Sequence, residues 1–371
     1  MYVFNFVKNK SLLPLFKIQS TPTIHFYFTN TSFMSRRLPA EWAPQSAIQF
    51  TFPHEDSDWL PMLDEVIPCF VRLIETVSQY QKVLVVCKDT EKMADLLRGA
   101  VQANLLLVSL PSNDTWARDH GAITVFDDEK PILLDFVFNG WGLKFAANKD
   151  NLITQRLFDK GIFKTKKILK GGLALEGGGI ESDGQGTLMT TIECLLSPNR
   201  NPHLSKRQIE QKLKRLFGVS RILWLENGYL AGDDTDSHID TLARLCDENT
   251  IAYVQCTDPN DEHYAALQRM ENELCAFRTE GGQPYKLVPL PMSEAIYDED
   301  GQRLPATFAN FLIINGAVLV PTYAVPQDAE ALDILRGCFP DREVIGLDCR
   351  PLIFQHGSLH CVTMQFPEGV V

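Results

Sequence analysis

Two short runs of the sequence are almost wholly apolar: KVLVVC at residues 82–87 and LLLVSL at residues 105–110. Continuous apolar runs of this length are typical of strands that are buried on both faces. Each run follows a segment with apolar residues at helical spacing, from Asp58 to Gln79 and from Thr90 to Ala103. Pro61 is tolerated because it falls in the first helical turn. Helices that alternate with buried strands predict the α/β class.

The helix-then-strand unit recurs about five times along the chain. One helix is expected to begin at Ser205, where Gln208 completes a capping-box pattern, and to end before Gly218. The units are unevenly spaced and do not repeat in sequence, so they do not indicate a solenoid. Periodicity alone leaves both a doubly wound sheet and a propeller open. The other expected elements are helices at 261–277 and 328–338 and strands at 221–225, 286–290, 311–320 and 343–347.

The composition is that of an acidic globular protein. The chain has 371 residues, of which 45% are hydrophobic, and a net charge of −12. This length alone suggests about two to three domains, but no long Gly/Ser or Pro linker divides the chain after residue 40, so we expect one α/β domain. An acidic surface repels phosphate backbones, so no nucleic-acid partner is expected. No apolar run approaches the ~18 residues of a membrane span, so no membrane association is expected.

The beginning of the chain differs from the rest. The first 40 residues contain no Asp or Glu and are rich in Phe, Ser, Thr and Asn. Such a start is found in transit peptides, but basic residues are few and no amphipathic helical pattern is clear. Met34 offers an alternative start, with residues 1–33 dispensable. We therefore expect a domain at residues 38–371, preceded by a disordered or artefactual extension at residues 1–37.

The nine cysteines are irregularly spaced and include no CxxC pair. Neither a zinc site nor a thioredoxin-type motif is therefore indicated. Most of the cysteines sit in apolar stretches. Buried, reduced thiols of a cytosolic protein fit most of them.

Four segments concentrate charged residues, Gly, His and Cys where a fold seldom needs them. The first follows a buried strand and predicts a loop at a strand end. The second has three consecutive glycines, which let the backbone approach a ligand closely. The third carries several carboxylates and one His, and the fourth contains a His-Cys pair. The segments are NDTWARDHG at 113–121, LEGGG at 175–179, GDDTDSHID at 232–240 and HGSLHCVT at 356–363.

Each segment taken singly also fits a structural role. An Asp-rich loop is usually solvated or binds calcium, although residues 232–240 lack the spacing and the bidentate Glu of an EF-hand. Arg118 and Asp119 fit a structural salt bridge, and three glycines fit a turn. His360 beside Cys361 fits a buried core. No single segment establishes an enzyme.

Together the four segments supply one thiol, one His and several carboxylates. A thiol with a His suggests nucleophilic catalysis. Carboxylates around a thiol would raise its pKa and would hinder attack on a neutral amide. A guanidinium, in contrast, is a planar cation with five N–H donors that match carboxylates bidentately. The set therefore favours a guanidinium substrate over a peptide bond.

Over roughly residues 38–367 the chain resembles the agmatine deiminase and bacterial-type peptidylarginine deiminase family. The resemblance implies the pentein fold, a single-domain, five-bladed α/β propeller, which would account for the five helix–strand units. The motifs that carry it are specific and occur in the family's order. They are PAEW at 39–42, residues 113–121, LEGG at 175–178, ECLLSPNRNP at 193–202, residues 233–240, NFLIING at 310–316 and HCVT at 360–363.

The resemblance implies a role for each polar site residue. Cys361 would attack the guanidinium carbon, and His238 would be the general acid and base. Asp119 and Asp240 would grip the guanidinium nitrogens. Glu176 would bind the guanidinium and orient His238. The family's enzymes are hydrolases of C–N bonds in linear amidines, and neither a metal nor an organic cofactor is implied.

The implied reaction is hydrolysis of agmatine to N-carbamoylputrescine and ammonia, with free or peptide-terminal arginine as alternative substrates. Trp116 would line the pocket. Asp234, four residues before His238, is a candidate for binding the agmatine ammonium, and a solvated loop carboxylate is the alternative interpretation. An arginine near the pocket would favour arginine as the substrate instead.

The sequence departs from the usual agmatine deiminase pattern in several places. Residues 356–359 read HGSL where the family usually has GGGN, and Asp236-Ser237 replaces Asn or Asp followed by Gly. Phe52-Pro53 stands for Trp-Pro, and Gly179 stands for Ser. The predicted catalytic atoms are retained, so the changes affect the surroundings of the substrate tail.

A non-catalytic pentein that acts as a binding protein is the alternative of another class. Retention of every catalytic position and the acidic charge disfavour it. The resemblance further suggests a homodimer, and the cysteine usage suggests the cytoplasm.

Overall fold

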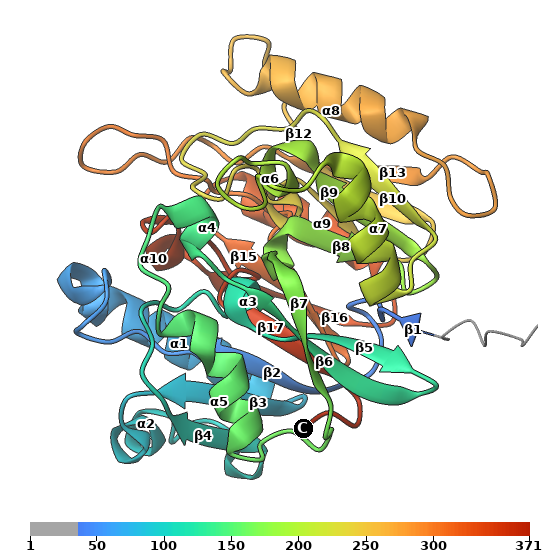
Figure 1. Cartoon of the computed structure of the whole chain (residues 1–371). Helices are drawn as coiled ribbons and strands as arrows, with labels where there is room; N and C mark the ends of the chain where they lie inside the picture. The colour runs from blue at the N-terminus through green and yellow to red at the C-terminus, as the bar shows by residue number, and fades with distance from the viewer. Residues whose placement is uncertain (1–35) are drawn as a thin grey trace, which may run out of the picture. The chain divides into compact units, whose positions relative to one another are not determined.

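The structure is a computed structural model that describes residues 36–371 (Figure 1). Residues 1–35 of the predicted N-terminal extension therefore lie outside the described residues. Arg36 and Arg37 form a short strand, β1, which pairs antiparallel with β5 (Ile123–Asp127). These two residues of the predicted extension thus belong to a sheet.

The strands of residues 36–371 form five separate sheets of three or four strands. A doubly wound single sheet is thereby excluded, and the five-bladed α/β propeller is confirmed. In strand order the sheets are β17–β2–β3–β4, β1–β5–β6–β7, β8–β9–β10, β11–β12–β13 and β14–β15–β16. The strands not yet given are β2 (Gln45–Thr51), β3 (Lys82–Cys87), β4 (Leu105–Ser109), β6 (Lys130–Val137), β7 (Ile168–Ala174), β8 (Ile180–Ser182), β9 (Thr187–Thr191), β10 (Arg221–Leu225), β11 (Ala243–Leu245), β12 (Thr250–Gln255), β13 (Lys286–Pro291), β14 (Leu312–Ile314), β15 (Ala317–Thr322), β16 (Glu343–Asp348) and β17 (Thr363–Pro367).

All five sheets share one connection pattern. A first strand runs antiparallel to the second, and the second leads through a helix to a parallel third strand. The ring closes where the C-terminal β17 pairs antiparallel with β2, and the red β17 lies beside the blue β2 in Figure 1. The crossover helices are α1 (Leu63–Ser78), α2 (Thr90–Leu96), α5 (Ile153–Asp159), α7 (Lys206–Phe217), α8 (Tyr264–Ala276) and α9 (Gln327–Cys338).

The remaining helices are short and sit in the connections between strands, some between sheets and some within one sheet. They are α3 (Ala117–His120), α4 (Gly140–Leu143), α6 (Ile192–Leu195) and α10 (Arg350–Ile353), with 3-10 turns at Leu60–Met62, Gln102–Asn104, Asp150–Leu152, Gly177–Gly179 and Ile239–Thr241. The helices of residues 36–371 are too short or too polar to cross a bilayer.

The predicted capping box of α7 is confirmed. Ser205 Oγ accepts the Gln208 N–H, the Gln208 side chain returns a bond to the Ser205 N–H, and the helix ends at Gly218 with a φ of 72°. The helix predicted over residues 90–103, in contrast, ends at Leu96. Gln102 Nε2 donates to the carbonyls of Leu97 and Ala100, so a side chain satisfies the groups that a longer helix would have bonded.

The strand-rich segment predicted at residues 311–320 forms a hairpin of β14 and β15. Its turn lies at Asn315 and Gly316, and Gly316 has a φ of 76°. An Asn-Gly pair between apolar runs is a strong hairpin signal. The Asn-Gly pair therefore signals the hairpin in the sequence, but the continuous apolar run around it makes the two strands hard to separate.

The segments that enter the first strand of each sheet occupy equivalent places in the five blades. Those before β5, β8 and β11 contact one another. Equivalent segments meet because the blades are arranged in a ring. Each segment brings one polar residue of interest: Asp119 before β5, Glu176 before β8, Asp240 before β11, Asn310 before β14 and Cys361 before β17.

Candidate active site

Gly178 marks the point where several predicted site residues meet. A Cβ atom on Gly178 would lie 2.6 Å from His238 Nδ1, 3.0 Å from Asp119 Oδ1 and 3.1 Å from Asp240 Oδ2. A side chain at this position would collide with them, so the glycine lets the imidazole and two carboxylates approach each other. Its own N–H donates to Asp119 Oδ1 at 3.0 Å.

The Cys361 thiol lies beside the same carboxylates. Its Sγ is 3.9 Å from Asp240 Oδ2 and 3.4 Å from Asn310 Oδ1. Asn310 Oδ1 also accepts the backbone N–H groups of His360 at 2.9 Å and of Cys361 at 3.4 Å, so this amide fixes the place of the thiol. Burial, together with the charges of Asp240 and Asp119, raises the pKa of the Cys361 thiol well above its usual range.

His238 stands between two carboxylates. Its Nδ1 is 3.6 Å from Asp119 Oδ1 and its Nε2 is 3.8 Å from Glu176 Oε2, both beyond hydrogen-bond length. Burial alone would lower the pKa of His238, but the Asp119 carboxylate helps to raise it well above its usual range. Both ring nitrogens, like Asp240 Oδ1, are buried without a hydrogen-bond partner. Such atoms mark where the donors and acceptors of a ligand fit.

The two carboxylates predicted to grip the substrate differ in their partners. Asp119 accepts only N–H groups, from Gly178 and, at 2.9 Å, from Trp141 Nε1, and burial raises its pKa. Asp240 Oδ2 lies 2.7 Å from His360 Nδ1. Burial alone would raise the pKa of Asp240, but this bond holds it below its usual value.

Glu176 lies on the Nε2 side of His238 and is fully buried. Both its oxygens accept from Arg200 Nε, at 3.0 and 2.8 Å, and the Cys194 Sγ is 3.9 Å from Oε2. Burial alone would raise the pKa of Glu176, but His238 and Arg200 together lower it. This position suits the orienting part of its expected role. Direct contact with the guanidinium stays a prediction.

Arg200 is a site residue to which the sequence gave no role. Besides Glu176 it binds the loop before His238, through Nη1 to Asp236 Oδ2 at 2.5 Å and Nη2 to the Thr235 carbonyl at 2.8 Å. The loop needs such support, because Asp236 and Ser237 both have a φ of 61°, a conformation that non-glycine residues seldom adopt. The only available signal was an arginine in the matching ECLLSPNRNP stretch.

The carboxylates of the acidic loop at residues 232–240 have partners within the protein. Asp233 accepts the Ser237 N–H and the Thr235 hydroxyl, and Lys144 Nζ lies 2.7 Å from Asp236 Oδ1. Arg200 completes the set on Asp236. The alternative of a calcium loop is thus not supported by the arrangement of these side chains.

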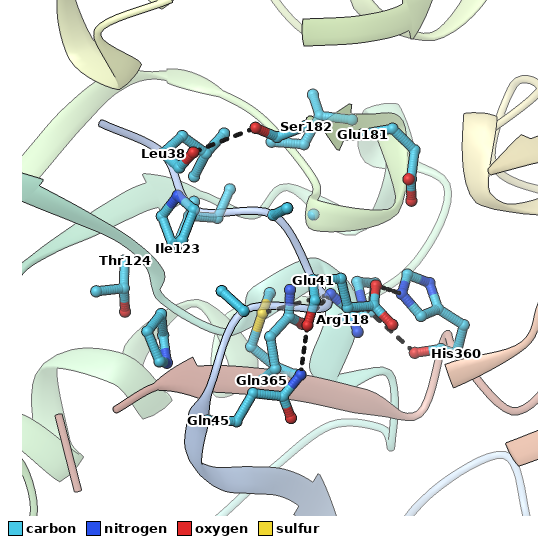
Figure 2. Close-up of a pocket in the computed structure, with 17 residues that line it drawn as sticks. Leu38, Glu41, Gln45, Arg118, Ile123, Thr124, Glu181, Ser182, His360 and Gln365 are labelled. Carbon is cyan, nitrogen blue, oxygen red and sulfur yellow. Dashed lines mark hydrogen bonds and ion pairs between the residues drawn. The ribbon is translucent and has the colours of Figure 1, made fainter. Parts of the chain in front are cut away.

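The predicted salt bridge between Arg118 and Asp119 is absent from the described residues. The Arg118 side chain turns away from the thiol and donates to Gln365 Oε1 at 2.5 Å and to the His360 carbonyl at 3.4 Å. Figure 2 shows it in a second cavity, beside His360 and Gln365. Asp119 is therefore not paired with Arg118, and it lines the cavity that holds Cys361.

A cavity of about 140 Å³ has Cys361 and Asp119 in its wall. Trp116 lines it as predicted and packs on Gly357, where a Cβ atom would lie 2.1 Å from the indole ring. None of the residues that line this cavity is Lys or Arg. The lining consists of Asp58, Asp114, Trp116, Asp119, Trp141, Phe145, Asp234, Thr235, Gln355, His356, Gly357 and Cys361.

Three further carboxylates stand in the same cavity, from Asp58, Asp114 and Asp234. Asp114 is engaged through Oδ1, which accepts from Trp59 Nε1 at 2.9 Å, and burial raises its pKa to about 6. The Asp234 side chain is 41% exposed, and its Oδ2 is 3.9 Å from His356 Nε2. The wall of the cavity is therefore acidic.

Two buried groups within residues 36–371 bring three potential metal ligands together. They are Glu176, Cys194 and His238, and Glu41, Glu181 and His360. In each group an arginine already pairs with the carboxylates: Arg200 with Glu176, and Arg244 with Glu41 and Glu181. The guanidinium supplies the positive charge that an ion would otherwise bring.

A model of the Porphyromonas-type peptidyl-arginine deiminase family matches residues 37–367. The chain belongs to this family. It is 30% identical to the agmatine deiminase of Stutzerimonas stutzeri, over 90% of this chain and 96% of that one.

Two solved structures are closely similar. A Porphyromonas gingivalis protein called a putative arginine deiminase is 56% identical, with a TM-score of 0.87 over 91% of this chain and 99% of that one. The C. jejuni agmatine deiminase, solved with substrate bound, is 40% identical, with a TM-score of 0.84 over 91% of this chain and 97% of that one.

The fork of Arg200 can be tested by Arg200→Lys. Lysine keeps the charge but cannot bind Glu176, the Asp236 carboxylate and the Thr235 carbonyl at once. We expect kcat/KM for agmatine, the substrate named for two of these relatives, to fall about ten- to a hundredfold, as for a lost bond to a charged group. Steady-state kinetics and a thermal melt measure the outcome.

Arg221→Lys is the matched control. Arg221 also makes a three-way fork, to Thr187 Oγ1, the Arg278 carbonyl and the Tyr285 hydroxyl, but it touches none of the site residues. Equal losses in the two variants would show that the effect is general destabilisation, and unchanged kinetics in Arg200→Lys would remove Arg200 from the account.

Proposed function

We propose that this protein is an agmatine deiminase, which hydrolyses agmatine to N-carbamoylputrescine and ammonia through a covalent adduct on Cys361. The observation that carries the proposal is the charge of the cavity around the thiol. Carboxylates of Asp119 and Asp240 lie next to Sγ, and three more stand further along the wall. A substrate with a cation at each end matches this distribution.

The reacting end must be a cation because of the carboxylates at the thiol. Asp119 and Asp240 accept only, and Asp240 Oδ1 has no partner within the protein. The planar N–H groups of a guanidinium fit such acceptors at fixed angles. The His238 nitrogens, likewise without partners, stand ready to exchange protons with it.

The far end of the substrate distinguishes agmatine from arginine. Agmatine ends in an ammonium, whereas free arginine adds a carboxylate. Asp58, Asp114 and Asp234 line the cavity and no Lys or Arg does, which favours the ammonium. Arginine, free or peptide-terminal, remains the second candidate because the P. gingivalis relative at 56% identity is called a putative arginine deiminase.

The proton states of the free protein suit the first half of the reaction. Cys361 is a thiol with a raised pKa, and His238, whose pKa is also raised, carries a proton. A guanidinium bound between Asp119 and Asp240 would neutralise their charge near the sulfur and so lower the pKa of the thiol. The thiol then releases its proton to solvent, and the thiolate adds to the guanidinium carbon. His238 protonates the departing amine, and ammonia leaves a thiouronium on Cys361.

The second half hydrolyses that adduct. A water molecule enters the place of the ammonia, and His238, now neutral, takes its proton as the oxygen bonds to carbon. The C–S bond breaks, the electron pair returns to sulfur, and the proton of the new hydroxyl passes to the sulfur as the ureido product leaves with its C=O formed. The carboxylates hold the reacting carbon in line throughout, which removes orientational entropy from both steps.

The setting of the reaction follows from the chemistry. Its product is one hydrolysis away from putrescine, so a place in polyamine synthesis is proposed. All nine thiols are free, which favours a reducing compartment such as the cytoplasm. A small guanidine is the proposed partner, without nucleic acid or membrane, and a homodimer stays a prediction from family resemblance.

A non-catalytic pentein that binds another molecule is the alternative of another class. It would have no need to bury a raised-pKa thiol close to the His238 imidazole and the carboxylates of Asp119 and Asp240. Burial of such groups costs stability, and proteins keep that cost mainly at functional sites.

Ammonia release by the purified protein tests the proposal. We expect turnover of agmatine, with kcat/KM at least tenfold above that of free arginine or of a peptide ending in arginine. Cys361→Ala should lose turnover and keep its melting temperature, while Cys87→Ser, at a buried position that lines neither cavity, should mainly lower the melting temperature. A preference for arginine would reject agmatine and keep the chemistry; no turnover of any guanidine would favour the binding protein.

Asp234→Asn tests how the tail is held. A charge-assisted bond to the ammonium, partly exposed to solvent, is worth about tenfold in kcat/KM. We expect that loss with agmatine and almost none with an alkylguanidine that lacks the terminal amine. Asp114→Asn is the comparison, because Asp114 lines the same cavity with a pKa of about 6. If Asp114 holds the ammonium instead, kcat/KM for agmatine falls in Asp114→Asn and not in Asp234→Asn. In the wild type, kcat/KM for agmatine then also falls as the pH drops through about 6, where the Asp114 carboxylate takes up a proton.

A further inference from the structure

A continuous chain of buried charged groups begins at Asp240 and leads away from the thiol. Asp240 Oδ2 lies 2.7 Å from His360 Nδ1, and His360 Nε2 lies 2.8 Å from Glu41 Oε2. Glu41 Oε2 also accepts from Arg244 Nη2 at 2.7 Å, and Arg244 Nε donates to Glu181 Oε1 at 2.5 Å. Each of the five residues is at most 8% exposed.

The side chains of this network that lie beyond Asp240 border the second cavity, which is seen in Figure 2. Glu41, Glu181 and His360 line it together with Arg118. Sequence neighbours are divided between the two cavities. Arg118 and His360 line the second one, while Asp119 and Cys361 line the one that holds the thiol. The wall of the second cavity therefore contains the direct sequence neighbours of Asp119 and Cys361.

His360 has a carboxylate oxygen within hydrogen-bond distance of each ring nitrogen. An ionised carboxylate only accepts, so both nitrogens must donate, and only the imidazolium carries a proton on each. Glu41 is ionised, because it accepts from Arg244 Nη2 and from the Ile313 N–H, and Arg244 holds its pKa well below its usual range although burial alone would raise it. The geometry therefore assigns the charged form to His360.

We propose that Glu41 and His360 are positioning residues for the deiminase reaction: Glu41 keeps His360 an imidazolium, and His360 holds Asp240 ionised and turned so that its second oxygen faces the guanidinium. The proposal rests on the proposed function, because Asp240 acts there on the substrate. It gives a role to the His of the His-Cys pair and to the Glu of the PAEW stretch, which the reaction itself leaves unused.

The charges around Asp240 fix the sign of the expected effect. Loss of the Glu41 charge would weaken the imidazolium, so Asp240 would be less stabilised as an anion and its pKa would rise. The acidic limb of kcat/KM then moves to higher pH. The other charged or titratable groups that act on Asp240 or are acted on by it are Arg118, Asp119, His238, Arg244 and Cys361.

Glu41→Gln and Glu181→Gln form a matched pair for the test. Both carboxylates are buried, both bind Arg244, and each accepts one backbone N–H, from Ile313 and Leu245 respectively. Of the two, only Glu41 is hydrogen-bonded to His360, whereas an oxygen of Glu181 lies within 4.8 Å of a ring nitrogen without a bond to it. We expect Glu41→Gln to lower kcat/KM about ten- to a hundredfold with a shifted acidic limb, while Glu181→Gln keeps the wild-type pH profile.

Chemical rescue separates positioning from damage to the fold. In Glu41→Ala the space beside His360 opens to the second cavity, so formate should enter and restore part of the lost kcat/KM. Chloride at equal ionic strength should not, and the longer side chain of Glu41→Gln should block rescue. Equal kinetic losses in the two Gln variants, or no effect of formate on Glu41→Ala with a wild-type melting temperature, would overturn the proposal.

A measurement on the wild type covers variants that fail to fold. Nitrogen-15 spectra of histidine-labelled protein should show protons on both ring nitrogens of His360 at the pH of the assay, with the signal assigned through His360→Gln. A bare ring nitrogen would overturn the proposal. This result does not depend on which guanidine is turned over, so failure of the agmatine assignment is distinguishable from failure of the positioning role.

Discussion

The burial of three carboxylates around the His238 imidazole, those of Asp119, Glu176 and Asp240, is the constraint on which the rest of the site depends. An unpaired buried carboxylate costs several kcal/mol. The chain meets this cost with a different partner for two of them: Arg200 pairs with Glu176, and His360 lies against Asp240. Arg200 lies only 24 positions from Glu176, beside the same sheet, whereas His360 lies 120 positions from Asp240, so the charge of Asp240 is balanced only when two separate blades meet.

Asp119 is the carboxylate whose cationic neighbour lies beyond hydrogen-bond length: Nδ1 of the protonated His238 is 3.6 Å from Asp119 Oδ1. Asp119 accepts N–H groups from Gly178 and Trp141, and burial raises its pKa. A cation that enters the cavity therefore gains most at Asp119, and it also offsets the charge that keeps Cys361 a thiol. The negative charge of Asp119 thus both selects a cationic substrate and makes activation of Cys361 depend on that substrate. A neutral amide would neither bind this charge nor lower the pKa of the thiol.

The sequence predicted the elements that are long and strongly patterned. β3 and β4 read as buried apolar runs, and α7 carried its own capping box, so local signals were sufficient. The three-residue strands β8 and β11 were missed, because three residues show no period. The choice between a doubly wound sheet and a propeller also exceeded periodicity, since it depends on which strands pair.

The predicted site residues came from motifs, whereas the partners that support them could not be predicted in the same way. Arg200 binds Glu176 across 24 positions, and Asn310 reaches Cys361 across 51. Pairings at such separations follow from the positions of the blades and leave no local pattern. The salt bridge between Arg118 and Asp119, the structural alternative for this pair, does not form for a related reason: the two neighbouring residues line different cavities.

The central claim is that Cys361 carries the substrate during turnover. Rapid acid quenching of the protein with agmatine, followed by mass spectrometry of its peptides, tests this directly. The account predicts a mass increase equal to agmatine less ammonia on the peptide that contains Cys361. Ammonia production with no adduct, or an adduct on Cys194 in its place, would contradict it.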